Sequence, residues 1–240
     1  MAARFDHLVV AVEDLDEAAA RWRAAGLPAE RGGAHPVGTE NVLVRGPGAA
    51  YVELIAAGSD ESNPWLDRVR SARGPISWAV AVDDLDEART SLLAAGFEPG
   101  PPVPGSRRTP GGELLEWRVC DVGPGPYDGS LPFLIEWKTP MGPGPADGPV
   151  LVSVVLTPPD PGRVSDLLVA LGLDAVRHGV QLGLAIGEPA DDGSARWSMV
   201  RDDDGTVPAV TLEMSMPDGN GRSVTVLDGV AVVSRPDRLS

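Results

Sequence analysis

The pattern of apolar and polar positions repeats along the chain. Residues 5–18 read FDHLVVAVEDLDEA and residues 75–88 read PISWAVAVDDLDEA, and 8 of these 14 positions are identical. Both stretches continue to the tripeptide AAG, at residues 24–26 and 94–96. A fainter copy, VSVVLTPPDPGRVSDLLVALG, covers residues 152–172. The repeat predicts three related structural modules.

Each copy predicts a strand followed by a turn and a helix. In the first copy, His7, Val9 and Ala11 alternate with apolar neighbours, which is typical of one face of a strand. Asp14 then occupies a helix N-cap position with Glu17 three residues later, as in a capping box. The second copy repeats the device, and the glycines that end each copy are expected at helix C-caps.

Short strands are expected behind each helix, which makes each module a β-α-β-β-β unit. These strands lie near residues 28–35, 41–45 and 50–56, near 97–99, 113–121 and 131–138, and near 179–187, 196–200 and 208–215. A last hairpin turns at Asp228-Gly229. The predicted fold class is α+β, with modules at residues 1–70, 71–140 and 150–240, the third degenerate. The Pro- and Gly-rich stretch 139–149 is the expected linker before the third module.

Charge and cysteine content limit the binding partners and the covalent or metal sites that can be expected. Lys and Arg number 20 against 35 Asp and Glu, a net charge of −15, which disfavours nucleic acid and anionic membrane surfaces. Cys120 is the single cysteine, so neither an internal disulfide nor a thiolate zinc site is expected. The N-terminal residues do not read as a secretory signal, and a cytoplasmic protein with a small-molecule ligand is predicted.

The repeated stretches, together with GGAHPVGTENVLV at 32–44, YVELI at 51–55 and LPFLIEW at 131–137, resemble glyoxalase-like proteins of the vicinal oxygen chelate superfamily. This superfamily includes glyoxalases, bleomycin resistance proteins and extradiol dioxygenases. The resemblance covers residues 4–140 and implies that two modules pair into a half-open cup.

The resemblance also implies where a divalent metal such as Fe, Zn, Mn or Ni would bind. Superfamily members take ligands from the first and last strands of each module, and the matching positions are His7, Glu53, Ser77 and Glu136. Ser77 stands where a second His or Gln is usual, and its hydroxyl is a poor ligand for such a metal. His7, Glu53 and Glu136 remain as a three-residue metal site, or the cup binds an organic ligand without metal. We expect His7 and Glu53 to face the same cavity.

Other polar and aromatic residues are candidates for catalysis and substrate binding. His35, between glycines and next to a proline, is a candidate proton-transfer residue, as is Glu53 in its apolar strand. Arg108, with Arg107, resembles a clamp for a carboxylate or phosphate, unless both lie in a solvated loop. Trp78 and Trp117, with Trp137, form a pocket wall or fill the core.

Two functions of different classes follow. The first is a metal-dependent lyase, isomerase or dioxygenase that acts on a small oxygenated substrate. The alternative is a non-catalytic protein that binds a small molecule or drug, as resistance proteins do. The third module carries Ser153 and a late Glu213, with His178 as its only histidine, and is expected to hold no site. It covers the cup within one chain, or pairs with a second chain in a homodimer.

Overall fold

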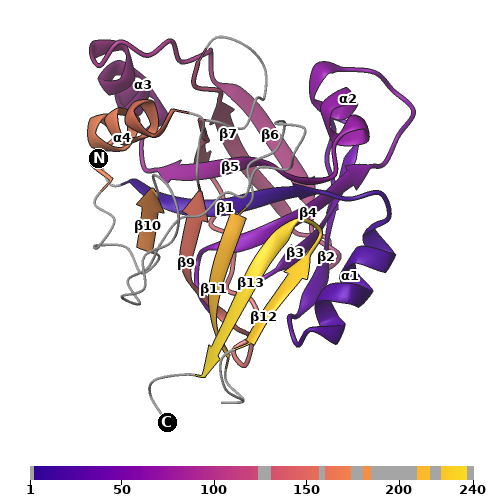
Figure 1. The fold of residues 1–240 in the computed structure, drawn as a ribbon. Helices are drawn as coiled ribbons and strands as arrows, with labels where there is room; N and C mark the ends of the chain where they lie inside the picture. Colours follow the sequence, from indigo (N-terminus) through magenta and orange to yellow (C-terminus); the bar gives the residue numbers. More distant parts are fainter. Residues whose placement is uncertain are drawn as a thin grey trace.

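The computed structural model describes residues 3–123, 131–156, 160–173, 181–184, 210–216 and 223–236. The elements are labelled in Figure 1. In chain order they are β1 (Ala3–Ala11), α1 (Leu15–Ala24), β2 (Ala29–Ala34), β3 (Thr39–Val44), β4 (Tyr51–Ala57), α2 (Pro64–Ser71), β5 (Gly74–Val82), α3 (Leu85–Ala94), β6 (Val103–Arg108), β7 (Leu114–Cys120), β8 (Phe133–Trp137), β9 (Val150–Leu156), α4 (Pro161–Ala170), β10 (Gln181–Leu184), β11 (Val210–Met216), β12 (Ser223–Leu227) and β13 (Val230–Pro236).

Among the described residues, eight strands form one large curved sheet in the order β2-β3-β4-β1-β5-β8-β7-β6 (Figure 1). The first strands of the two modules, β1 and β5, pair antiparallel at its centre. Each of them pairs on its other side with the parallel last strand of its own module, β4 or β8. The α+β fold with two paired β-α-β-β-β modules is thus confirmed, and the two modules share one sheet.

Local sequence explains where the first helix of each module begins and ends. The Asp14 carboxylate accepts hydrogen bonds from the backbone N–H groups of Asp16 and Glu17 at 2.8 and 2.9 Å. Asp84 caps α3 in the same way, with both bonds at 2.9 Å. Gly26 and Gly96 follow the two helices with φ of 81° and 79°, a conformation that favours glycine. The predicted caps are therefore confirmed.

The large sheet has an outer face and a concave face. On the outer face, α1 and α3 bury the main core, in which Leu8, Val80 and Leu134 are fully enclosed. The concave face carries smaller apolar clusters, one of which includes Val69 of α2 packed near Ile55. This concave face is the cup that the resemblance implied.

The C-terminal strands form a second sheet, in the order β10-β9-β11-β13-β12, which we call the C-terminal sheet. Its central pair, β9 and β11, is antiparallel, and each is flanked by a parallel strand, β10 or β13. The same pattern surrounds β1 and β5 in the large sheet. Glu213 lies opposite Ser153 on the antiparallel partner β11, whereas Glu53 lies on a strand parallel to β1. His178 lies outside the described residues, and the division at 1–70, 71–140 and 150–240 stays a prediction.

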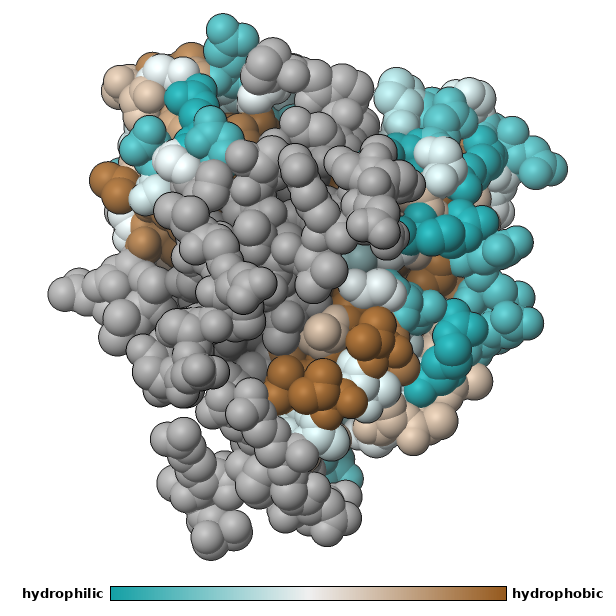
Figure 2. All heavy atoms as spheres, viewed as in Figure 1, coloured by the Kyte–Doolittle hydropathy of each residue, from teal (hydrophilic) through white to brown (hydrophobic). Residues whose placement is uncertain are grey.

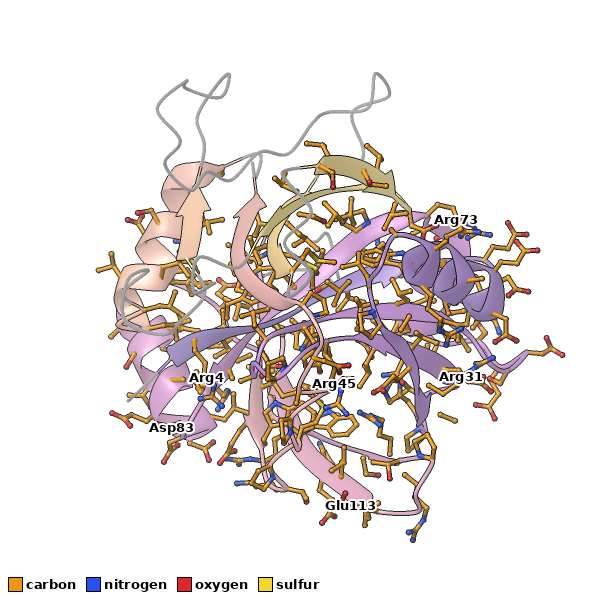
Figure 3. The ribbon with its side chains drawn as sticks, turned by 90° about the horizontal axis from the view of Figure 1, so that it is seen from below. Arg4, Arg31, Arg45, Arg73, Asp83 and Glu113 are labelled. Carbon is orange, nitrogen blue, oxygen red and sulfur yellow. The ribbon has the colours of Figure 1, made fainter. Side chains whose placement is uncertain are left out.

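The C-terminal sheet packs on the outer face of the large sheet within the same chain. Its strands cross β1 and β4 steeply in Figure 1, and Figure 3 shows the two sheets as stacked layers. Leu156, Leu212 and Val232 belong to the same buried cluster as the cores of α1 and α3. The intrachain covering role expected for this region is therefore observed. An arrangement as a homodimer stays a prediction.

At the free edge of the C-terminal sheet, β12 exposes Val224 and Val226. Figure 2 shows an apolar patch in the region of β12. Scattered exposed apolar residues are common on soluble domains and by themselves indicate no partner. In the part of the chain that the structure describes, no helix has the length and apolar character needed to cross a bilayer.

Candidate functional site

The centre of the cup is shaped by a β-bulge in each of the two central strands. Phe5 pairs with Val80 and His7 with Ala79, so Asp6 is an extra residue in β1. A bulge turns neighbouring side chains toward the same face. Asp6 and His7 therefore both reach the concave side. The second bulge, in β5, falls between Pro75 and Ser77, at the matching position of the repeat.

His7 is buried and held in one orientation. Its Nδ1 lies 2.6 Å from Oδ1 of Asp6, whose Oδ2 accepts a hydrogen bond of 3.0 Å from Nε1 of Trp137. The imidazole stacks on the Tyr51 ring with 4.7 Å between centroids. A carboxylate at Nδ1 favours the tautomer that carries its proton there. The Nε2 atom then presents a lone pair to the cup.

Glu53 lies at the centre of a cluster of polar and aromatic side chains, with 8% of its surface exposed. The other members are Asp6, His7, His35, Asn41 and Tyr51. Oε2 of Glu53 is 3.7 Å from Nε2 of His7, so the two side chains face each other on the concave side of the sheet. Its Oε1 accepts a hydrogen bond of 2.6 Å from Nδ2 of Asn41 and lies 3.8 Å from Nε2 of His35. The carboxylate thus stands between two imidazoles with one amide donor.

His35 is oriented from both ring nitrogens. Its Nδ1 is 2.8 Å from Oγ1 of Thr39, and its Nε2 is 3.3 Å from Nδ2 of Asn41. Burial lowers the pKa of His35; the nearby charge of Glu53 opposes this shift, while Arg107 and His7 reinforce it. His35 is therefore a neutral imidazole at neutral pH, able to accept a proton on Nε2.

Glu136, predicted as a metal ligand, is placed on the other face of the sheet. Its carboxylate pairs with Arg118 at 2.5 Å and with Lys138 at 2.6 Å. Arg118 also reaches Asp86 of α3, on the outer face. The structure therefore does not bring Glu136 to His7 and Glu53.

Phe133 occupies the position in the second module that Glu53 occupies in the first. Glu53 is the register partner of Val9 in β1, and Phe133 is the partner of Ala79, the matching residue of β5. The Phe133 ring lies 5.5 Å from the His7 ring, so it faces the cup. A sequence signal exists: both strands contain Leu-Ile, at 54–55 and 134–135, and aligning these pairs puts Phe133 opposite Glu53.

The residues present do not fit a divalent cation held by both modules. The first module offers His7 and Glu53, but the second offers the Ser77 hydroxyl and the Phe133 ring at the matching positions. Within the described ranges, no group of three or more His, Cys, Asp or Glu side chains is arranged to hold a metal ion.

The predicted substrate-binding residues are placed differently from one another. The Trp117 ring lies 6.0 Å from the His35 ring, inside the cup. Trp78 is 1% exposed in the core of the outer face. Arg108 is exposed and donates to the Gly112 carbonyl at 3.0 Å, whereas its neighbour Arg107 is buried.

Three residues of the cluster were not predicted as site residues. Asp6 reaches the cup only through the bulge, and no local signal in the sequence marks that bulge. Tyr51 reads as an ordinary strand residue. Asn41 carries a usable signal, because a side-chain amide directly before the apolar residues Val-Leu-Val needs a polar partner if it is buried.

Comparison with solved structures shows the fold over the whole chain. A hypothetical protein from Staphylococcus aureus superimposes with a TM-score of 0.71 at 13% identity, covering 98% of this chain and 100% of that one. A methylmalonyl-CoA epimerase from Streptomyces coelicolor, in complex with 2-nitronate-propionyl-CoA, gives a TM-score of 0.43 at 20% identity, over 57% of this chain and 98% of its own. The enzyme of that name from Mycobacterium tuberculosis gives 0.40 at 22% identity, over 59% and 88%.

A search of curated proteins finds no significant match. The family model described as "Glyoxalase-like domain" matches residues 5–172, which is more than half of the chain. This range contains both modules of the cup and every residue of the cluster around Glu53. The chain therefore belongs to the glyoxalase-like domain family, within the vicinal oxygen chelate superfamily.

Proposed function

We propose that this protein is an enzyme that moves a proton on a small oxygenated substrate, with Glu53 as the base. The observation that carries the proposal is the buried carboxylate of Glu53 with His7 and His35 on either side. Base-assisted removal of a proton next to a carbonyl is a step of many isomerases and lyases. Of the three predicted enzyme classes, lyase, isomerase and dioxygenase, this chemistry favours the isomerases and lyases.

The neighbours of Glu53 have distinct roles in such a step. Asn41 donates to Oε1 and leaves Oε2, on the side of His7, as the oxygen that accepts the substrate proton. His7 can take that proton on Nε2, because Asp6 at Nδ1 stabilises the imidazolium that forms. The same proton then returns to the substrate from Glu53 or from the His7 imidazolium, while His35, neutral and unprotonated at Nε2, is a second proton acceptor on the other side of the carboxylate. No step is assigned to a metal ion, because the donor set does not fit one.

The test is exchange of carbon-bound hydrogen for deuterium in D₂O, followed by NMR over a panel of small oxo and hydroxy acids and aldehydes. Glu53→Gln should slow exchange of any active compound by roughly 10²- to 10⁴-fold, the usual contribution of a general base. Glu136→Gln is the matched control, because it removes a carboxylate bound on the outer face. Equal rates in the wild type and Glu53→Gln would show that Glu53 is not the base.

The aromatic lining supports a second candidate, a non-catalytic small-molecule binder. Tyr51, Phe133, Trp117 and Trp137 surround the histidines of the cup. A binder would exchange no compound of the panel, and its affinity for an apolar ligand would survive Glu53→Gln. Exchange that depends on Glu53 would exclude this candidate.

A further inference from the structure

The two edges of the large sheet meet at a seam between β2 and β6. These strands stand at opposite ends of the strand order, yet Nη1 of Arg107 donates to the Gly32 carbonyl across the seam. A Cβ atom at Gly33 would collide with the Arg108 carbonyl. The backbones therefore approach closely, and the guanidinium of Arg107 bridges the two modules.

A pocket of about 560 Å³ opens at this seam. The first module contributes Ala34, His35 and Pro36 to its lining, and the second contributes Ser106, Arg107, Arg108 and Leu114. The volume lies in the range of small-molecule sites. Because His35 belongs both to the pocket lining and to the cluster around Glu53, the pocket lies next to the proposed base.

Arg107 brings a buried positive charge to this pocket. The residue is 5% exposed, and its polar contacts are the Gly32 carbonyl and Sδ of Met141 at 3.7 Å. Among the described residues, no carboxylate lies within ion-pair distance of it, although other arginines of the chain pair with acids. Burial lowers the pKa of Arg107, but an arginine keeps its proton under such conditions.

A buried cation without a counter-ion is unfavourable unless a ligand supplies the opposite charge. We propose that Arg107 binds the carboxylate group of the substrate, so that the substrates are small carboxylic acids entering at the seam. A guanidinium has five N–H donors in a planar fork, and two of its nitrogens make the contacts described above. The remaining donors match the two oxygens of a carboxylate.

This inference deepens the proposed function, because a carboxylate bound at Arg107 orients the rest of the acid toward Glu53. A single-charged group is favoured over a phosphate dianion, since the charge of Glu53 is close enough to raise the pKa of Arg107 against the effect of burial. Binding at Arg107 is measurable without turnover.

The test compares benzoate with its neutral isostere benzamide by quenching of tryptophan fluorescence, which Trp117 near His35 should report. Acetate and acetamide form a second pair for a pocket too narrow for a ring. The wild type should bind the carboxylate at least tenfold more tightly than the amide. Arg107→Gln should weaken carboxylate binding roughly tenfold or more, as expected for loss of a charge-assisted hydrogen bond.

Arg89→Gln is the matched control, because Arg89 also donates to a backbone carbonyl, that of Gly100, but lies on α3 away from the seam. If Arg107→Gln fails to fold, Arg107→Lys keeps the charge without the fork and should bind the carboxylate several-fold more weakly than the wild type. Arg108→Gln should have the smaller effect, since Arg108 is exposed.

Failure of this inference is distinguishable from failure of the proposed base. Glu53→Gln should still bind the carboxylate even where proton exchange is lost. The inference is overturned if neither carboxylate binds, if carboxylate and amide bind equally, if the Arg107 variants bind like the wild type, or if inorganic phosphate binds more tightly than both carboxylates.

Discussion

His35 is the residue of the site whose charge state depends most directly on burial. In the folded protein its pKa lies below the ordinary value, first because it is buried and further because Arg107 and His7 are near. Glu53 acts in the opposite direction without cancelling the shift. A neutral His35 is what a proton acceptor at this position requires, so the same burial that positions the ring also sets its chemistry.

This lowered pKa predicts a loss of stability in acid. The unfolded chain protonates its histidines near pH 6.5, before folded His35 does, so the free energy of unfolding should fall as pH drops below about 6.5. His35→Gln lacks this contribution, and the wild type should lose up to about 1.4 kcal/mol more than the variant per pH unit. Urea unfolding of both proteins at pH 7.5 and 5.5 measures the difference. Parallel losses in the two proteins would contradict it.

Single positions also explain why the site was only partly predictable. Glu53 was identified because a carboxylate in an apolar strand needs a partner, His7 because of the resemblance, and His35 because of its flanking glycines and proline. Regular alternation would put Asp6 on the face opposite His7, but the bulge brings both side chains to the concave face. Matching Glu136 to Glu53 by residue type, rather than by the shared Leu-Ile pair, placed the wrong residue of β8 opposite Glu53.

At the scale of elements, the edge strand β2 makes room for the polar side chain of its neighbour. A Cβ atom at Gly32 would collide with Oδ1 of Asn41, the residue whose amide group holds Glu53. In the second module, a Cβ at Gly105 would meet the Trp117 indole. Both edge strands therefore use a glycine to admit a side chain of the cup.

Gly32→Ala should consequently disturb the site through packing alone. The added methyl pushes the Asn41 amide away from Glu53, and overpacking of this kind costs about 1–3 kcal/mol. Proton exchange should fall together with the free energy of unfolding. Gly48→Ala is the control, because the nearest atom to its Cβ would be Cγ1 of Val150 at 3.9 Å. Equal stability of the two variants would argue against this role of Gly32.

The helix that opens each module was predicted more completely than the strand partners, for a physical reason, whereas α2 was not predicted. A capping residue such as Asp14 or Asp84 acts on backbone groups within three positions, so the sequence contains the whole interaction. Strand pairing joins distant segments, and the order of β9, β10 and β11 depends on contacts that local patterns do not encode. The third copy of the repeat is visible in the sequence as one module. The C-terminal sheet nevertheless has the strand pairing that two modules have in the large sheet.

At the scale of the whole molecule, the C-terminal sheet stabilises the cup from outside. Asp228, at the turn between β12 and β13, accepts hydrogen bonds from Nη2 of Arg21 at 2.7 Å and from Nε1 of Trp22 at 2.8 Å. Trp22 is fully buried on α1. One carboxylate therefore joins the turn of the C-terminal sheet to the first module.

Removing this charge should measure the coupling between the two sheets. Asp228 has φ of 47°, a conformation that asparagine tolerates, so Asp228→Asn keeps the turn while weakening both bonds, and should cost about 1–3 kcal/mol of unfolding free energy. Asp83→Asn is the control: Asp83 pairs with Arg4 at 3.7 Å on the surface (Figure 3), and its loss should change stability by less than about 0.5 kcal/mol. Both are measured by urea unfolding. If the two variants are equally stable, Asp228 does not couple the sheets; if Asp228→Asn instead splits unfolding into two transitions, the carboxylate is what makes them unfold as one unit.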